Sequence, residues 1–382
     1  MSGTRLIQPG LSRRKFIKGI GASMVAAPFL NALTGCTSDG SSHRTRLVLL
    51  GTTGGVTWWP STTRTSSSSA IMVGETMYLI DVGQGSTTRL TQAFNTGDSY
   101  TGSGSTTFLK NLKALFLTHL HQDHTADYPA LLLIGVGSGM NGDDPLQVIG
   151  PCNRGQLEIN KTGFPVDGVI WTDSSDPSWI TPTPGTAQMT ETVWQAFAQT
   201  INNMTLDAAY PDFRKTVQCT EIGTPLATQD SPTCPATPPF EIYRDDLVQV
   251  TATLVDHHQV YPAFAFRFDT DDGSIVFSGD TGPETNGNLQ TLADGADILV
   301  HEVIDRVWID YKFPEPSPLK THMLEAHTAI DAVGAVAESC RVKTLVLNHI
   351  VPGDTPMPRL LEAGKNFSGR LIVGEDLMQI GI

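Results

Sequence analysis

Three imidazoles and one carboxylate lie within the six-residue stretch His119-Leu120-His121-Gln122-Asp123-His124. Imidazole and carboxylate groups together bind zinc, manganese or iron in proteins. An apolar run over 114–117 precedes this stretch and predicts a buried strand, and residues 126–134 predict a helix. The four side chains therefore lie where a strand turns into a helix. Alternate positions of an extended backbone point the same way, so the first two histidines face one side and the later pair can reach a second ion.

Polar residues that can bind metal follow several further apolar runs, each at the predicted carboxyl end of a strand. They are His257 and His258 after 250–255, Asp280 after 274–277, His301 and Glu302 after 298–300, and His349 after 344–348. Another histidine, His327, opens a helix predicted over 328–338. One histidine at a strand end is more often structural than catalytic. The repetition of one arrangement in a single chain favours a shared site instead.

The order of these motifs resembles that of the metallo-β-lactamase superfamily. The resemblance rests on HxHxDH, a later lone histidine, Gly279-Asp280-Thr281 and a final histidine, and it covers roughly residues 45–382. Thr52-Thr53-Gly54-Gly55 and Asp81-Val82-Gly83-Gln84-Gly85 are similar to early motifs of the family. His301-Glu302, Ala326-His327-Thr328 and Leu347-Asn348-His349 are most similar to its tRNase Z and arylsulfatase-like branch. The resemblance implies an α/β fold, an αββα sandwich of two mixed sheets with helices outside and metals at one edge.

The family pattern implies a binuclear site for two divalent metal ions. His119, His121 and His257 would hold the first ion, Asp123, His124 and His349 the second, and Asp280 would bridge the two. His257 is preferred because its spacing to the residues that follow matches the branch, and His258 stays as the alternative ligand. Zinc is the expected metal, with manganese or iron as alternatives.

The same resemblance implies how catalysis would work. Water shared by two divalent cations is deprotonated near neutral pH and can attack an ester. The candidate catalytic residues are Asp123 within the metal site, His327 as proton donor to the leaving oxygen, and Glu302 as the group that orients a histidine. The alternatives are a helix-start role without catalysis for His327 and simple packing within a strand for His301.

The first 36 residues predict an export signal. Ser12-Arg13-Arg14-Lys15-Phe16-Ile17-Lys18 is typical of a twin-arginine motif, and the apolar stretch 19–35 is shorter and more broken than a membrane span. Leu33-Thr34-Gly35-Cys36 resembles a lipobox, in which Cys36 would be acylated and would anchor the chain. Cleavage and release into the periplasm is the alternative. Residues 37–44 would be a linker, and the twin-arginine export machinery would be a partner.

The charge of the exported chain bears on its substrate. Of 25 basic and 39 acidic residues, 1–35 hold five basic and no acidic ones, which leaves 20 against 39 and a formal net charge of −19. An acidic surface repels phosphate backbones. RNA enzymes of the branch commonly carry an RNA-gripping arm between the lone histidine and the bridging aspartate, whereas 258–279 leaves room for one hairpin. Asp127 also differs from the small residue of those enzymes. Nucleic acid is therefore not expected as a substrate.

The remaining length predicts one domain, 45–382, with an insertion over about 153–241 between the second and third metal motifs. Within it, 190–204 predicts a helix and 213–243 a loop. Cys219 and Cys234 bracket part of that loop, and we expect them to form a disulfide in an oxidising compartment. We also expect the insertion to overhang the site and to shape the substrate pocket.

These features predict an exported metal-dependent hydrolase that cleaves an anionic ester of small or medium size, either an aryl sulfate or a phosphodiester. Four alternatives remain: an endoribonuclease acting on tRNA 3′ ends, a lactonase or β-lactamase acting on a carbonyl, a non-enzymatic binding module, and a redox di-iron protein. The complete set of candidate ligands disfavours the binding module. The di-iron proteins carry a glutamate in place of His121 and an attached flavin domain. A homodimer is compatible with the sequence, which leaves the oligomeric state open.

Overall fold

The computed structural model describes residues 43–55, 59–95, 97–98, 100, 102, 104–155, 183–224, 233–283 and 286–382. All of them belong to the compact unit Thr37–Ile382. The predicted export signal, the lipobox with Cys36 and most of the predicted linker lie outside the described residues. None of the helices in the described ranges is long and apolar enough to cross a lipid bilayer.

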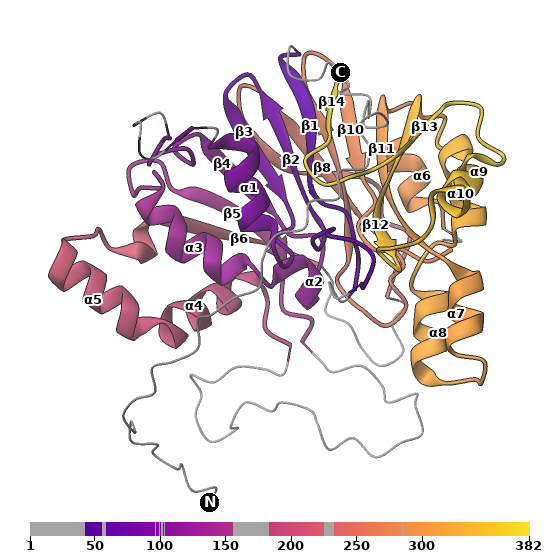
Figure 1. Ribbon diagram of the computed structural model, residues 1–382, viewed down its shortest axis with the longest axis horizontal. Coiled ribbons are helices and arrows are strands. Elements are labelled where there is room, and N and C mark those ends of the chain that lie inside the picture. The colour runs from indigo at the N-terminus through magenta and orange to yellow at the C-terminus, as the bar shows by residue number, and fades with distance from the viewer. Residues whose placement is uncertain are drawn as a thin grey trace, which may run out of the picture. The chain divides into compact units, whose positions relative to one another are not determined.

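Two seven-stranded mixed sheets form the centre of this unit (Figure 1). The first sheet has the order β14 (Gln379–Gly381), β1 (Thr45–Gly51), β2 (Ser68–Val73), β3 (Thr76–Ile80), β4 (Leu112–Phe116), β5 (Leu146–Pro151), β6 (Val217–Ile222). The second sheet has the order β13 (Arg370–Val373), β12 (Thr344–Val351), β11 (Ile298–Ile304), β10 (Ser274–Phe277), β9 (Phe264–Asp269), β8 (Gln249–Leu254), β7 (Phe240–Arg244). The chain enters the first sheet, builds most of it, and then builds the second.

Alternation along each strand divides its side chains between two apolar layers. In β1, Leu47 and Leu49 belong to the layer between the sheets, while Val48 and Leu50 belong to the outer layer of the first sheet. The inner layer is rich in aromatic rings, and the ring centroid of Phe116 lies 5.0 Å from that of Phe268. Burial of these side chains on both faces of each sheet supplies the main stabilisation of the fold.

Helices cover the outer face of each sheet (Figure 1). The helices whose apolar side chains pack on the first sheet are α1 (Ser86–Phe94), α3 (Tyr128–Gly137) and α4 (Thr186–Ala196). Those that pack on the second sheet are α6 (Asn288–Ala293), α9 (Ile330–Ser339) and α10 (Met357–Leu360). The remaining helices are α2 (Gln122–Thr125), α5 (Ala198–Ala208), α7 (Arg306–Lys312), α8 (Pro318–Glu325) and two short 3-10 helices, Phe213–Thr216 and Leu361–Gly364. The predicted αββα sandwich is confirmed.

The strand directions bring the predicted site motifs to one edge. Strands β3 to β6 run parallel in the first sheet, and β10 to β13 run parallel in the second, so each set ends on one side of its sheet. The two sheets meet there, because Phe264 donates its backbone N–H to the carbonyl of Thr118 over 3.0 Å and Thr53 forms a bridge with Ile350. Residues that follow β4 in the first sheet therefore lie close to residues of the second sheet that follow β8 and β10 or belong to the end of β12.

The segment predicted as an insertion contains more regular structure than its sequence indicated. The predicted helix is confirmed and is split into α4 and α5, whereas the loop predicted over 213–243 is wrong because β6 and β7 lie within it. Both are edge strands with mostly half-exposed or exposed residues, so they lack the apolar alternation that reveals a buried strand. The outer bounds of the insertion stay a prediction, and 156–182 lies outside the described residues.

The predicted disulfide between Cys219 and Cys234 is wrong in this structure. Cys219 lies on β6, and its thiol donates to Oγ1 of Thr190, a residue of α4, over 3.2 Å. The thiol of Cys234 lies beside the carbonyl of Leu254 at the end of β8 and accepts a hydrogen bond from the Asn286 side chain. The two cysteines thus lie against different sheets, because Cys219 is part of β6 in the first sheet and Cys234 contacts the end of β8 in the second.

Candidate metal centre

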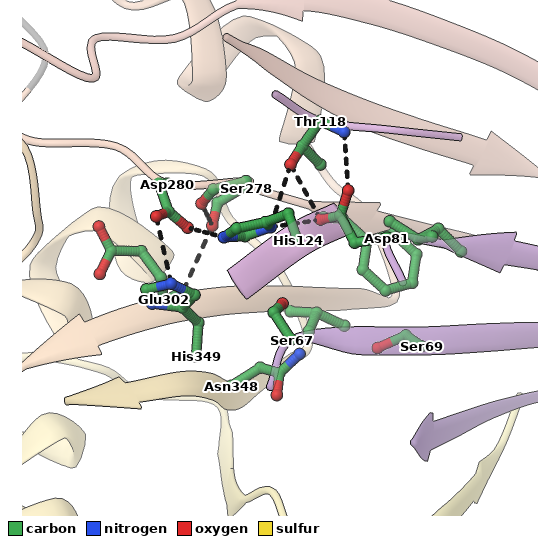
Figure 2. A pocket seen from close by; sticks show the side chains of 14 residues that line it. Ser67, Ser69, Asp81, Thr118, His124, Ser278, Asp280, Glu302, Asn348 and His349 are labelled. Carbon is green, nitrogen blue, oxygen red and sulfur yellow. Dashed lines mark hydrogen bonds and ion pairs between the residues drawn. The ribbon is translucent and has the colours of Figure 1, made fainter. Parts of the chain in front are cut away.

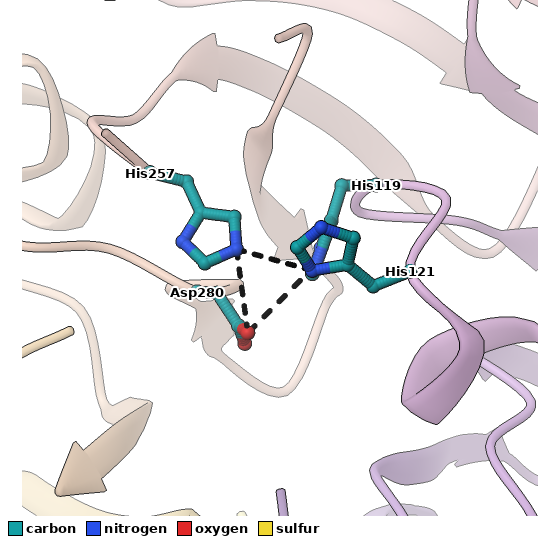
Figure 3. Close-up of side chains that lie close together, drawn as sticks. All are labelled: His119, His121, His257 and Asp280. Carbon is teal, nitrogen blue, oxygen red and sulfur yellow. Dashed lines mark hydrogen bonds and ion pairs between the residues drawn. The ribbon is translucent and has the colours of Figure 1, made fainter. Parts of the chain in front are cut away.

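The predicted ligands converge into two clusters that share one carboxylate. The first consists of His119, His121, His257 and Asp280 (Figure 3), and the second of Asp123, His124, Asp280 and His349. Within each cluster, one candidate ligand atom from every residue lies within 4.8 Å of the others. The division matches the one that the family pattern implies, including the place of Asp280 between the two sets.

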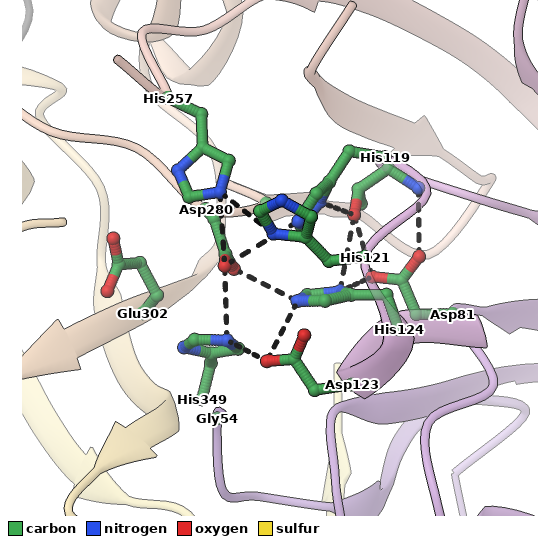
Figure 4. Close-up of polar contacts among 12 residues, drawn as sticks. Gly54, Asp81, His119, His121, Asp123, His124, His257, Asp280, Glu302 and His349 are labelled. Carbon is green, nitrogen blue, oxygen red and sulfur yellow. Dashed lines mark hydrogen bonds and ion pairs between the residues drawn. The ribbon is translucent and has the colours of Figure 1, made fainter. Parts of the chain in front are cut away.

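The carboxylate of Asp280 occupies the middle of this arrangement (Figure 4). Its Oδ2 lies 3.8 Å from His119 Nε2, 3.8 Å from His257 Nε2 and 3.1 Å from His349 Nε2. Its Oδ1 lies 3.2 Å from His124 Nε2. One oxygen thus faces both clusters and the other faces only the second, which is the placement that a bridging carboxylate needs.

Buried polar atoms without hydrogen-bond partners test whether the site suits cations. Within the described part of the chain, such atoms include His119 Nε2, His124 Nε2 and Asp280 Oδ1, all in the clusters. A buried polar atom without a partner costs about 1–3 kcal/mol. Nitrogen lone pairs and carboxylate oxygens that face a common centre are relieved of this cost when they bind a cation, so the residues present fit a divalent metal pair.

The charges of the histidines and carboxylates in both clusters also indicate that the site suits cations. Burial lowers the pKa values of His119 and His257, with Asp280 opposing, so these imidazoles are neutral and can offer a lone pair. Burial also disfavours charge on His349, yet Asp280 and Asp123 outweigh it and raise the pKa of His349 to about 10. The pKa of Asp280 is held well below its usual range by His349, His124 and His119 against its burial. The buried carboxylates therefore require positive charge, which protons or metal ions can provide.

Residues outside the two clusters form hydrogen bonds with the candidate ligands and orient them. Asp81 is one of these residues, and the sequence alone did not assign it this role. Asp81 follows β3, and its Oδ2 lies 2.8 Å from Nδ1 of His124, which donates to it (Figure 2). Thr118 donates its N–H and its hydroxyl to the same carboxylate over 2.8 and 2.9 Å. A donor bond from Nδ1 leaves Nε2 of His124 as the metal-facing atom. Similarly, His257 Nδ1 donates to the carbonyl of Ala326 over 2.9 Å.

The early glycine motif contacts the second cluster directly. Gly55 donates its N–H to Asp123 Oδ2 over 2.6 Å, which orients that carboxylate. A Cβ atom at Gly54 would lie 2.0 Å from the ring of His349 (Figure 4). Only glycine can therefore stand at position 54 without displacing His349.

The predicted catalytic pair is also assembled. His327 Nδ1 lies 3.1 Å from Glu302 Oε1, which also accepts the backbone N–H groups of Thr281 and Thr328, each over 3.1 Å. The ring of His327 stacks on that of His349 with centroids 5.7 Å apart. Although burial disfavours charge on His327, Glu302 outweighs it and raises the pKa of His327. Glu302 thus hydrogen-bonds to His327, and His327 lies beside the second ligand cluster, while the catalytic roles of both residues stay predictions.

The structure distinguishes the neighbouring histidines. His258 has a backbone φ of 54°, and its Nδ1 pairs with Glu325 over 3.1 Å, so His257 alone of the two joins a cluster with Asp280. His301 is buried in β11, and its Nδ1 donates to the carbonyl of Glu302 over 2.7 Å, which fits the packing alternative.

Sequence reasoning did not single out His322, which lies on α8. Its ring centroid lies 5.6 Å from that of His257 and 6.0 Å from that of His327. Burial and the neighbouring imidazoles lower the pKa of His322 to about 4. A histidine in the middle of a polar helix carries no strand-end signal, so only the packing of α8 against the site reveals it.

Comparison with known proteins gives sequence relatives named ribonuclease Z and solved structures of the same fold. No protein-family model matches the chain. Ribonuclease Z of Mycobacterium bovis is 28% identical over 349 residues, with 88% of this chain and 98% of the relative covered. The crystal structure of the short form of human tRNase Z aligns with a TM-score of 0.54 at 19% identity, covering 88% of this chain and 99% of that one. Zinc-bound PqqB of Methylobacterium extorquens aligns with a TM-score of 0.51 at 12% identity, covering 88% and 100%.

These relatives overturn the expectation that nucleic acid is excluded as a substrate, because they are named ribonuclease Z and tRNase Z. Asp127 does not support that expectation either. Its carboxylate accepts the N–H groups of Gly85 and Thr87 and the hydroxyl of Thr87, so it fixes the start of α1 and takes no part in the clusters. With two sheets between helical layers and two clusters of candidate metal ligands at their junction, this chain has the metallo-β-lactamase fold.

Proposed function

We propose that the protein is a binuclear metal-dependent phosphodiesterase that hydrolyses ribonucleic phosphodiester bonds. The observation that carries this proposal is the pair of clusters joined by Asp280, with the His327–Glu302 pair beside them. Two divalent cations held there, zinc by preference, would lower the pKa of a water molecule from 15.7 to about 7 and neutralise charge on the substrate's non-bridging oxygens.

The chain's own residues supply the proton for the leaving group. Glu302 accepts from Nδ1 of His327, so Nε2 is the atom left to donate a proton to the departing oxygen. Although burial disfavours the charged imidazole, Glu302 and Asp280 raise the pKa of His327, which favours the protonated form that a proton donor needs. Among the site residues, His121 and His327 keep partial exposure while His119 and His124 are buried, so substrate reaches the centre from their side.

The names of the relatives support one of the ester classes that the candidate ligands alone do not distinguish. Sulfate and phosphate esters both present a tetrahedral anion to a pair of metals. Relatives named ribonuclease Z favour the phosphodiester, and they favour RNA over an aryl sulfate or a lactone.

Metal content and a set of competing substrates test this proposal. The purified chain without 1–36 is expected to hold two metal ions and to cleave bis-p-nitrophenyl phosphate and a short RNA with a 3′ extension. It should not cleave p-nitrophenyl sulfate. Asp280→Asn is the inactive control, because it removes a charge that both clusters share. Faster turnover of the sulfate, or two bound metals without cleavage of either phosphodiester, would contradict the proposal.

We also propose that the chain is exported through the twin-arginine pathway. The support is the sequence of 1–36 alone, with Arg13 and Arg14 in the motif and Cys36 in the lipobox. Arg13→Lys with Arg14→Lys should retain the protein in the cytoplasm, and Cys36→Ser should abolish labelling by a fatty-acid probe. Export of the double lysine variant at the unaltered rate would refute the pathway.

A further inference from the structure

A cavity of about 190 Å³ lies beside the first cluster of candidate metal ligands. Its walls come from three segments: the end of β5 with the residues after it, the residues before α4, and the turn after the lone histidine. The lining residues are Leu120, His121, Pro151, Cys152, Arg154, Thr183, Pro184, Val260, Tyr261 and Pro262. His121 belongs both to this cavity and to the first metal cluster, so the two sites are continuous.

One charged and one aromatic side chain give this cavity its chemistry. Arg154 is only 8% exposed, and its Nη1 donates to the carbonyl of Gln259 over 2.6 Å. Its guanidinium carbon lies 6.0 Å from the ring centroid of Tyr261, which is also 8% exposed. A guanidinium fixed by a backbone carbonyl and an aromatic ring is held in one orientation. The other walls are mainly proline and aliphatic side chains.

We propose that this cavity is a subsite for the heteroaromatic base of the nucleotide next to the scissile bond. The inference rests on the proposed phosphodiesterase activity and names the part of the substrate that gives it specificity. Apolar walls and the Tyr261 ring suit the faces of a planar base, since bases stack on aromatic side chains. The Arg154 guanidinium suits the oxygen and nitrogen acceptors on the edge of a base.

Continuity with the metal centre explains why the occupant is a base and not an unrelated ligand. If a phosphodiester is bound at the two clusters, the nucleoside on one side of its phosphate lies next to His121. This residue belongs to the first cluster and also lines the cavity. A volume of about 190 Å³ admits one ring system and not a drug-sized molecule, for which pockets of roughly 300–1,000 Å³ are usual. The cavity therefore fits a single base.

Binding of two phosphates that differ only in the base tests the subsite without requiring turnover. Isothermal titration of the zinc-loaded chain with adenosine 5′-monophosphate and with ribose 5-phosphate should show about tenfold tighter binding of the nucleotide, the order that one stacked base contributes. Tyr261→Leu and, independently, Arg154→Gln should each reduce that ratio while leaving the affinity for ribose 5-phosphate unchanged. Arg214→Gln is the matched control, because that arginine forms an exposed ion pair with Asp212 and does not line the cavity.

The outcomes separate the subsite from the proposed function. Equal affinities for the two phosphates in the unaltered chain, or a ratio that both variants leave intact, would overturn the subsite while leaving the metal centre in place. Failure to bind either phosphate would overturn both proposals, since a nucleotide subsite beside a metal centre must retain one of them. Melting curves and zinc content of each variant identify those that have folded and can be interpreted.

Discussion

Asp81→Asn provides a sharp test of how the metal centre is built, because it changes one atom behind a ligand and none in the clusters. In the structure, Nδ1 of His124 donates to Asp81 Oδ2 over 2.8 Å. An asparagine can place its carbonyl oxygen toward the N–H of Thr118, and its amide N–H₂ then faces His124. That amide donates where the carboxylate accepted, so Nδ1 must become an acceptor and the ring proton must move to Nε2. Nε2 is the atom that faces Asp280 over 3.2 Å, and a protonated nitrogen cannot bind a metal.

The expected magnitude follows from the energetics of such partners. Loss of a carboxylate behind a metal-bound histidine typically costs 10- to 100-fold in metal affinity, about 1.4–2.7 kcal/mol. Asp81 is 3% exposed and accepts three hydrogen bonds, so bulk solvent does not readily take its place. We therefore expect a loss near the upper end of this range, confined to the ion that His124 would hold.

Zinc competition with a chromophoric chelator measures the affinity of each ion separately. Asp127→Asn is the matched control: Asp127 also accepts three hydrogen bonds from the chain, and none comes from an imidazole. Asp81→Asn should weaken one of two zinc ions, while Asp127→Asn should lower thermal stability and leave both affinities intact. Equal zinc affinities in Asp81→Asn and the unaltered chain, or equal losses in both variants, would refute the reasoning.

Three further predictions concern the neighbouring histidines, the proton donor and the metal-free protein. His257→Ala should lose one zinc ion by mass spectrometry and His258→Ala should retain both, and the reverse result would assign the ligand to the other residue. Glu302→Gln removes the carboxylate that raises the pKa of His327, so the alkaline limb of kcat for an RNA substrate should move to lower pH. A p-nitrophenyl ester, whose leaving group needs no proton, should show no such shift, and a shift with both substrates would argue against His327 as the donor. In the metal-free protein the pKa of His349 is raised to about 10, so its contribution to stability is complete below about 6.5 and is lost as pH rises toward 10. The melting temperature of the metal-free chain should therefore fall over that interval more steeply than that of the zinc-loaded chain, and parallel profiles would contradict this.

The ligands could be predicted from the sequence because each depends on a local pattern. An apolar run followed by a histidine or an aspartate describes a strand and its end, and parallel strands end on the same side of a sheet. His119, Asp280 and His349 all follow that pattern, and the structure brings them together. Alternation along the backbone separated the first two histidines of HxHxDH from the later pair, and family resemblance then assigned His257, Asp280 and His349 to the two clusters.

The partners that orient those ligands could not be predicted in the same way. Asp81 lies 43 residues before His124, and their contact depends on how β3 and β4 pair in the first sheet. His322 reaches the site only because α8 packs beside it. His257 and His258 are adjacent in sequence and differ in role because the backbone turns at position 258, where φ is 54°. Each of these relations belongs to tertiary packing, which single-sequence patterns do not describe.

The expectation that nucleic acid is not a substrate relied on net charge, which also describes the chain as a whole and not the site. The value of −19 is a sum over residues 36–382, and charges at the surface are screened beyond about 10 Å at 0.1 M ionic strength. At the site itself, four carboxylates are buried: Asp81, Asp123, Asp280 and Glu302. Two divalent cations would balance these four carboxylates. A phosphodiester that enters from the side of His121 and His327 therefore meets no excess of negative charge, although the chain as a whole is strongly acidic.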